Sequence, residues 1–250
     1  MSELEKVYGV HAVEAVLRHH PKRVKQLWLA EGRQDPRVQT LVELAKQARV
    51  STASRDRREL DEWAEGVHQG VVAEVSPSQV WGENMLEELL ERAEGPPLLL
   101  VLDGVTDPHN LGACLRTADA AGVLAVIVPK DKSATLNATV RKVACGAAEV
   151  IPLVAVTNLA RTLEKLQQRG LWIVGTAGEA EQDIYALDMS GPTVLIMGAE
   201  GKGMRRLTRE HCDYLARLPM SGSVSSLNVS VATGVCLFEA VRQRRGKLAG

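Results

Sequence analysis

The sequence lacks features that would each assign the chain to a particular class of protein. No run approaches the ~18 consecutive apolar residues of a membrane-spanning helix, and residues 1–5 lack the basic and then apolar plan of a signal peptide. The four cysteines, Cys114, Cys145, Cys212 and Cys236, form no Cys-x-x-Cys pair and have no histidine at zinc spacing. We therefore expect a cytoplasmic protein with buried free thiols and no metal site.

Aromatic residues are also scarce, at 3% of the chain with a single Phe. Modules that bind single-stranded RNA stack bases on aromatic side chains, so the sequence offers few such platforms. The formal net charge of −1 is unevenly spread, because residues 61–95 hold 9 acidic residues and 1 basic residue. This pattern fits a solvated acidic connector between two mildly basic domains, and it favours recognition of any RNA through phosphates and shape.

What the sequence does contain is enough apolar residues, 45% of 250, for one or two globular domains. Residues 76–97 open with Ser-Pro-Ser, close with Gly-Pro-Pro, and carry Leu86, Leu89 and Leu90 at the spacing of a short amphipathic helix. We interpret this stretch as a linker. The predicted parts are thus a small domain over residues 1–75, the linker over 76–97, and a larger domain over 98–250.

Both parts have the alternating pattern of an α/β fold. In the first, strands are expected at 26–29 and 70–75 and a helix at 36–49, with no obvious catalytic set, so a binding role is the default. In the second, apolar strands are expected at 98–103, 124–129, 150–154, 171–175 and 193–198. Strands this apolar are typical of a parallel sheet covered on both faces.

A long helix is predicted at the end of the chain, over residues 229–245. Val231, Val235 and Phe238 would form one apolar stripe of this helix. Three arginines occupy its last turn, at positions 242, 244 and 245. They suit the helix dipole in solvent, and contact with phosphate is the alternative.

Three segments of the larger part carry candidate chemistry. In residues 107–118, Asn110 could be a plain helix N-cap. Alternatively, Asn110 and Arg116, about 9 Å further along a helix, could share one site. Residues 194–204 run from a strand into a glycine-rich turn that matches neither the dinucleotide nor the Walker A spacing, so phosphate cradling is disfavoured. Residues 218–230 form a loop of small hydroxyl residues that suits a ligand, although Ser226, Asn228 or Ser230 could act only as caps.

Together and in this order, the three segments resemble the signature motifs of the SpoU class of SPOUT methyltransferases. Residues 7–13 and 68–70 resemble the substrate-binding domain attached to many members. The resemblance implies transfer of a methyl group from S-adenosylmethionine to an RNA ribose 2'-hydroxyl. The whole chain is most similar to enzymes that act on a guanosine of 23S ribosomal RNA, in the peptidyl-transferase P-site hairpin.

The resemblance also implies an architecture. The larger domain would be a SPOUT fold with a parallel sheet and a deep trefoil knot, formed by the segments that carry the second and third motifs. The smaller domain would be an RNA-binding α/β fold like that of kink-turn-binding ribosomal proteins. Members of the class act as homodimers, and neither DNA nor a membrane is expected as a partner.

Site residues follow from the same resemblance, position by position. Catalytic roles fall on Arg116, Asn110, Glu200, Ser226 and Asn228. Binding of S-adenosylmethionine falls on Gly198, Leu218, Leu227, Thr176 and Met220. A guanidinium with a pKa above ~12 is a poor base, so Arg116 is expected to hold phosphate and polarise the hydroxyl, while Glu200 either fixes Arg116 or receives the proton.

Two alternative functions stay open at this point. One is a transfer-RNA 2'-O-methyltransferase of the same class, and the other is a non-enzymatic RNA-binding factor of ribosome assembly that has kept the fold. A separate N-terminal domain favours ribosomal RNA as the substrate, but only by analogy.

Overall fold

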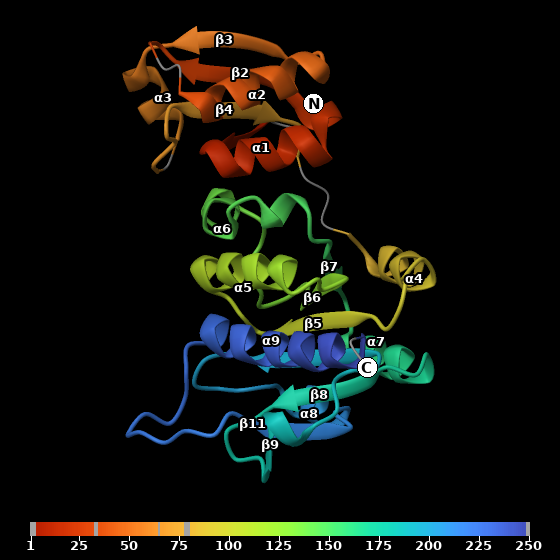
Figure 1. Ribbon diagram of the computed structural model, residues 1–250. Coiled ribbons are helices and arrows are strands. Elements are labelled where there is room, and N and C mark those ends of the chain that lie inside the picture. The colour runs from red at the N-terminus through yellow and green to blue at the C-terminus, as the bar shows by residue number, and fades with distance from the viewer. Residues whose placement is uncertain (1–3, 33–34, 65, 78–80, 249–250) are drawn as a thin grey trace. The chain divides into compact units, whose positions relative to one another are not determined.

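The computed structural model describes residues 4–32, 35–64, 66–77 and 81–248, which form two compact units (Figure 1). Unit 1 comprises Met1–Gln79 together with Leu136–Val150, and unit 2 comprises Val80–Thr135 together with Ile151–Gly250. Unit 1 is therefore discontinuous in sequence. Residues 1–3, part of the stretch that lacks the plan of a signal peptide, and Ser78 of the expected linker lie outside the described residues.

Unit 1 is built on a four-stranded sheet of order β1-β4-β2-β3. Its strands are β1 (Glu5–Tyr8), β2 (Val24–Ala30), β3 (Ser51–Arg55) and β4 (Val71–Val75). The β2–β3 pair is parallel, and β4 pairs antiparallel with both β1 and β2. The predicted strands at 26–29 and 70–75 correspond to β2 and β4.

Helices cover both faces of this sheet. They are α1 (Val10–His19), α2 (Pro36–Gln47) and α3 (Arg57–Trp63), with the 3-10 turn η1 (Pro21–Arg23) between α1 and β2. Val71 belongs to the core that includes α1 and α2, whereas the next residue, Val72, belongs to the core that includes Leu60 of α3. This is the alternation expected of a strand buried on both sides. The predicted helix 36–49 ends two residues early, because Arg49 has a left-handed backbone with φ 58°.

The segment Leu136–Val150 completes unit 1 with helix α6 (Ala138–Ala144) and the 3-10 turn η2 (Ala147–Glu149). Ala138 packs against the core around Leu60, and Gly146 lies so close to α1 that an added Cβ would be 2.8 Å from the Cβ of Ala15. Gly146 also has a φ of 98°, which favours glycine. Close packing and backbone conformation therefore both hold this segment to α1.

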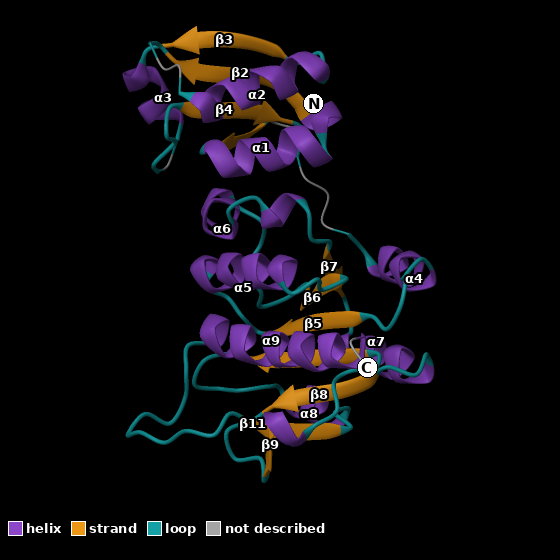
Figure 2. Cartoon of the chain, viewed as in Figure 1, coloured by secondary structure: helices purple, strands orange, loops and turns teal. Residues whose placement is uncertain are grey.

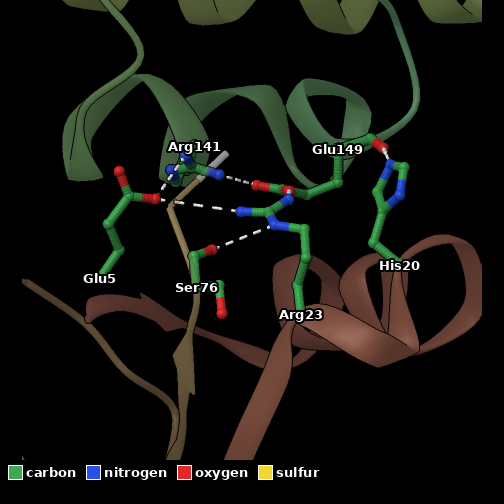
Figure 3. A network of polar contacts seen from close by, with 6 residues as sticks. All are labelled: Glu5, His20, Arg23, Ser76, Arg141 and Glu149. Atoms are coloured by element: carbon green, nitrogen blue, oxygen red, sulfur yellow. Dashed lines mark hydrogen bonds and ion pairs between the residues drawn. The ribbon is translucent and has the colours of Figure 1, made fainter. Parts of the chain in front are cut away.

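A network of charges joins the same segment to the N-terminal strands and helix (Figure 3). Arg141 and Glu149 are each only 4% exposed, and they pair with each other. Glu149 also accepts from Arg23 Nη1 at 2.6 Å, and Glu5 accepts from Arg141 Nη2 at 2.9 Å. Since buried charges are tolerated only when paired and hydrogen-bonded, this network specifies how the segment docks.

The stretches 7–13 and 68–70, which resembled a substrate-binding domain, form one structural corner. The Val10 amide, at the start of α1, donates to Gln69 Oε1 at 3.1 Å, and the Gly9 amide donates to the Val71 carbonyl at 3.1 Å. His68 is buried, and its Nδ1 accepts from the Gly70 amide at 2.9 Å. These residues thus fix the start of α1 against the start of β4.

Unit 2 contains a seven-stranded sheet of order β7-β6-β5-β10-β8-β11-β9, in which every pair is parallel. The strands are β5 (Leu98–Asp103), β6 (Ala125–Pro129), β7 (Leu153–Val156), β8 (Trp172–Thr176), β9 (Gln182–Asp183), β10 (Thr193–Gly198) and β11 (Tyr214–Arg217). The expectation of a parallel sheet is confirmed. The strand predicted at 150–154 is wrong at its start, since Pro152 has no amide to donate and β7 begins after it.

Helices cover both faces of this sheet as well (Figures 1 and 2). They are α4 (Glu83–Glu91), α5 (Pro108–Ala120), α7 (Leu159–Gln168), α8 (Arg206–Glu210) and α9 (Val229–Leu248), with the 3-10 turn η3 (Ile184–Ala186). Leu86 of α4 and Leu163 of α7 share one core with β5, while α5 and α9 contact each other. The helix predicted within residues 76–97 therefore packs on unit 2. No helix in the described ranges is long and apolar enough to cross a bilayer.

Helix α9 differs from its sequence-based prediction in two respects. Val231 and Phe238 of the predicted stripe are 52% and 49% exposed, and the buried face instead includes Cys236, Leu237 and Ala240. Arg244 donates to backbone carbonyls, among them Pro96 and Gly191, both at 2.6 Å. It therefore anchors the helix, whereas a dipole-and-solvent role or a phosphate role was expected.

Candidate active site

The carboxyl ends of β5 and β10 meet at the centre of the parallel sheet. Gly198, the last residue of β10, is in register with Asp103, the last residue of β5. The chain proceeds from β5 to β6 and β7 on one side, and β8 lies on the other side beyond β10. Open α/β sheets bind ligands where the strand order reverses in this way.

A tight glycine turn follows β10 at this point. The Ala199 amide donates to the Gly203 carbonyl at 3.1 Å, and the Gly203 amide donates back to Ala199 at 2.8 Å. The turn folds over Gly198 so closely that an added Cβ would lie 2.3 Å from the backbone carbon of Gly203. Only glycine fits at position 198, and Gly201 and Gly203 supply the left-handed φ values of 73° and 66°.

A buried carboxylate holds the far end of the turn. Asp103 is 1% exposed, accepts from the Arg205 amide at 2.8 Å and pairs with Arg205 Nε at 2.6 Å. Sequence patterns do not predict this pair. The signal available was an acidic residue at the end of an otherwise apolar strand, where parallel sheets carry functional groups.

A cavity of about 630 Å³ opens beside the glycine turn. Its lining includes all the residues to which binding of S-adenosylmethionine was assigned: Gly198, Leu218, Leu227, Thr176 and Met220. Glu200, Ser226 and Asn228 line it too. The volume lies within the range of about 300–1,000 Å³ typical of small-molecule sites. Residues from β8, the glycine turn and the long loop before α9 thus line one site.

Thr176 is tied to the sheet by its hydroxyl, which donates to the Ile196 carbonyl at 3.0 Å. Its oxygen can still accept a hydrogen bond from a ligand. Within the described chain, no cluster of three or more His, Cys, Asp or Glu residues has the arrangement needed to hold a metal ion.

Three polar side chains from distant segments meet at the edge of this cavity. Glu200 Oε1 accepts from Asn228 Nδ2 at 2.7 Å and from Asn110 Nδ2 at 3.4 Å. Asn228 Nδ2 also donates to Asn110 Oδ1 at 2.9 Å. The structure therefore brings together one predicted residue from each of the three sequence segments. We call Asn110, Glu200 and Asn228 the polar trio.

Two of these side chains were also considered as plain helix caps. That reading is wrong for Asn110, because Asp107 is the N-cap of α5 and accepts from the His109 amide at 2.9 Å. It is correct in part for Asn228, whose Oδ1 accepts from the Ser230 amide at 2.9 Å at the start of α9. Asn228 therefore joins the helix terminus to Glu200, because it uses its oxygen for the cap and its amide for the carboxylate.

Arg116 lies on α5, exposed to solvent. Six residues of helix separate it from Asn110, which corresponds to about 9 Å of rise and about 120° of rotation. It is not among the described residues that line the cavity. The structure thus brings Asn110 to Glu200 and Asn228, and places Arg116 on another part of the same helix.

Two family models match the chain. The family model described as "SpoU rRNA Methylase family" matches residues 97–238, and the model "RNA 2'-O ribose methyltransferase substrate binding" matches residues 6–81. The second match covers α1, α2, α3 and strands β2, β3 and β4 of unit 1, and the first covers every residue of the polar trio.

Among curated relatives, the "23S rRNA (guanosine-2'-O-)-methyltransferase RlmB" of Pseudomonas aeruginosa is 87% identical, over 98% of each chain. Its Escherichia coli K12 counterpart is 59% identical over 98% of this chain and 100% of its own length. Among solved structures, the SpoU methyltransferase AviRb from Streptomyces viridochromogenes superposes with a TM-score of 0.81 at 26% identity, covering 98% of this chain and 91% of its own. The same enzyme in complex with AdoMet gives a TM-score of 0.80 at 26% identity, covering 96% and 90%.

Proposed function

Because the chain belongs to the SpoU rRNA methylase family, we propose that it transfers the methyl group of S-adenosylmethionine to the ribose 2'-hydroxyl of a guanosine in 23S ribosomal RNA. The relatives that match nearly the full length carry this activity in their names. The observation that carries the proposal is the polar trio beside a cavity of about 630 Å³ at the carboxyl edge of the sheet.

S-adenosylmethionine would occupy this cavity, as AdoMet is the cofactor bound in a structure of the related AviRb. Gly198 and the turn after it present backbone groups at close range, and Leu218, Leu227 and Met220 supply an apolar wall. When bound, the cofactor supplies a methyl group on a cationic sulfur. A pocket poor in water favours a transition state in which that charge is cancelled by the developing negative charge of the hydroxyl oxygen.

The polar trio would orient the ribose and take its proton. Glu200 Oε1 is held by the side chains of Asn228 and Asn110 and by the Val229 amide at 3.3 Å. Its second oxygen, Oε2, has no hydrogen bond or ion pair with another described residue. We assign that oxygen as the acceptor of the 2'-hydroxyl proton. Arg116, permanently charged, would hold a phosphate of the RNA and polarise the hydroxyl, since a guanidinium is a poor base.

Residues 1–75 would bind the RNA. The match of residues 6–81 to a substrate-binding family supports this role, and Arg57 and Arg58 are exposed at the start of α3. Deleting the domain is a poor test, because it would strip the buried Arg141 and Glu149 of their partners Arg23 and Glu5. A double substitution of Arg57 and Arg58 by Ala should weaken RNA binding and reduce its salt dependence, while affinity for S-adenosylmethionine stays unchanged.

The finer expectations belong to the same proposal. The target is the peptidyl-transferase P-site hairpin, and the enzyme works in the cytoplasm. A deep trefoil knot is supported by the way residues 194–204 and 218–230 wrap one cavity. A homodimer is supported by the exposed apolar stripe of α9, where Val231 and Phe238 are 52% and 49% exposed.

The test is methyl transfer by the purified chain from labelled S-adenosylmethionine to 23S ribosomal RNA transcripts, with the modified nucleotide mapped. Arg116→Ala should keep cofactor binding and lower the methylation rate by about a hundredfold or more. Near-normal turnover would remove Arg116 from the mechanism. Methylation of transfer RNA in place of 23S RNA, or cofactor binding without any transfer, would overturn the proposed function.

A further inference from the structure

A second cavity of about 470 Å³ lies on the other side of the glycine turn. It shares Ala199, Glu200, Lys202, Gly203 and Val229 with the larger cavity as a common wall. Its remaining lining comes from the end of β5 and the loop after it, from Asn110 of α5, from the loop after β6, and from Arg205. In-line transfer requires donor and acceptor to approach along one axis, so an acceptor nucleotide in the second cavity would meet a donor in the first at Glu200. This inference therefore rests on the proposed function.

The carboxylates of the second cavity differ in what they already bind. Asp103 pairs with Arg205, and Asp107 caps α5. Glu200 accepts hydrogen bonds from the other two members of the polar trio. Asp131 also lines this cavity, is exposed, and has no hydrogen bond or ion pair with another described side chain. Of the described carboxylates at this cavity, Asp131 is therefore the one with both oxygens available to a ligand.

A carboxylate with two available oxygens selects among nucleobases. It accepts two hydrogen bonds side by side and therefore needs two adjacent donors. Guanine presents N1–H and N2–H₂ in this arrangement on its Watson–Crick edge, whereas uracil, cytosine and adenine each place an acceptor beside their donor. We propose that Asp131 binds N1–H and N2–H₂ of the acceptor guanosine in the second cavity, and so selects guanosine as the methylated nucleoside.

The next residue complements this assignment. Lys132 is exposed, lines the same cavity and adopts a left-handed backbone with φ 59°. An ammonium donor in the same cavity as the Asp131 carboxylate matches the O6 acceptor that lies beside N1–H on guanine. Asp131 and Lys132 thus bring to one cavity the acceptors and the donor that the guanine edge requires.

Inosine provides the test, because it keeps O6 and N1–H of guanine but lacks the N2 amine. Single-turnover methylation would be measured on RNA carrying guanosine or inosine at the target position, with wild type and Asp131→Ala. The wild type should methylate the guanosine RNA about tenfold to a hundredfold faster, as expected for one lost hydrogen bond to a charged group. Asp131→Ala should methylate both RNAs at similar, reduced rates.

Lys132→Gly adds a second readout. Glycine tolerates the left-handed backbone, so the loop is preserved. Because O6 is common to both bases, this variant should slow methylation of both RNAs and keep the preference for guanosine. Asp119→Ala, which removes an exposed carboxylate of α5 that lines neither cavity, serves as the matched control and should behave as wild type.

The outcomes separate this assignment from the proposed function. If Asp131→Ala keeps the wild-type preference for guanosine, or if the wild type methylates both RNAs equally, Asp131 does not read the base although the chain is a methyltransferase. A loss of S-adenosylmethionine binding by Asp131→Ala in calorimetry would also overturn the assignment, since it would place Asp131 in the donor site. Failure of the wild type to methylate guanosine RNA would overturn the proposed function itself.

Discussion

Each unit of the chain joins distant segments through a cluster of polar side chains, but the two clusters differ in charge and in access to water. In unit 1, Arg141 and Glu149 are both 4% exposed and pair with each other, and their outer partners are Arg23 and Glu5 (Figure 3). In unit 2, the polar trio places one carboxylate between two neutral amides, and both Glu200 and Asn228 are exposed.

This difference separates a structural cluster from a catalytic one. The unit 1 network pairs two arginines with two glutamates, so that each charge offsets another, and its loss should affect folding. The polar trio leaves one oxygen of Glu200 without a partner among the described residues, beside two cavities, so its loss should affect chemistry. Substitutions ranked by their expected effect on stability test this distinction.

The largest loss of stability is expected for Glu149→Ala. The substitution removes the carboxylate that pairs with the buried Arg141, and breaking a buried pair costs about 3–5 kcal/mol. Because Glu5 remains, we expect a decrease of about 3 kcal/mol in the free energy of unfolding of unit 1. Denaturant unfolding, with hydrogen exchange of the β4 amides to localise the change, measures it.

Glu14→Ala is the matched control for this prediction. It breaks the exposed Glu14–Arg18 pair at 2.8 Å on α1, which is worth about 0.3–0.5 kcal/mol. Equal losses for the two variants would mean that the buried network contributes no more than a surface ion pair, and the contrast between the clusters would fail.

An intermediate loss is expected for Gly198→Ala. Its Cβ would lie 2.3 Å from the Gly203 backbone carbon, so the whole turn must shift, at a cost of about 1–3 kcal/mol. Since the turn is the wall between the cavities, affinity for S-adenosylmethionine should fall together with stability. Gly191→Ala, at the other end of β10, places its Cβ in open space and should change neither quantity in calorimetry and thermal unfolding.

A small loss of stability with a large loss of activity is expected for Glu200→Gln. The amide oxygen still accepts from Asn228, and the residue is exposed, so unfolding should change by less than about 1 kcal/mol. An amide cannot take the hydroxyl proton, so the methylation rate should fall by about a hundredfold or more. If Glu200 only orients its neighbours, the variant will keep most of its activity. Glu210→Gln, in an exposed pair with Arg206, should resemble wild type in both measurements.

The same contrast explains how far the sequence could predict the molecule. Strands β5 and β10 have the predicted bounds because each is a run of apolar residues with a polar residue only at one end. Local hydrophobic pattern is enough to set the bounds of such strands. The strand predicted at 150–154 was wrong at its start because Val150 follows the turn η2 and belongs to unit 1. No local pattern records that contact, since Glu149 pairs with Arg23, 126 residues away.

For the site, motif resemblance predicted more than periodicity. The residues assigned to the cofactor came from resemblance, and the structure brings all of them to one cavity; their binding role stays a prediction. The Asp103–Arg205 pair was missed because charge pairing across 102 residues leaves no local trace. Scarce aromatics likewise gave no hint that Trp28 and Trp63 lie with ring centroids 5.4 Å apart in unit 1.

The smallest effect on stability is expected from thiol modification, which compares the two units without a substitution in either. Burial raises the pKa of Cys114 to about 11 and that of Cys236 to about 12, and burial followed by the nearby Asp213 carboxylate raises the pKa of Cys212 to about 12. These three thiols, all in unit 2, are therefore protonated and shielded at pH 8, and only the thiolate reacts. Cys145 of unit 1 is exposed. A disulfide reagent should thus label Cys145 quickly and leave stability unchanged, and the buried Cys114 and Cys236 should react only as fast as unit 2 unfolds. Rapid labelling of Cys114 in folded protein would show that the interior of unit 2 opens more readily than its packing implies.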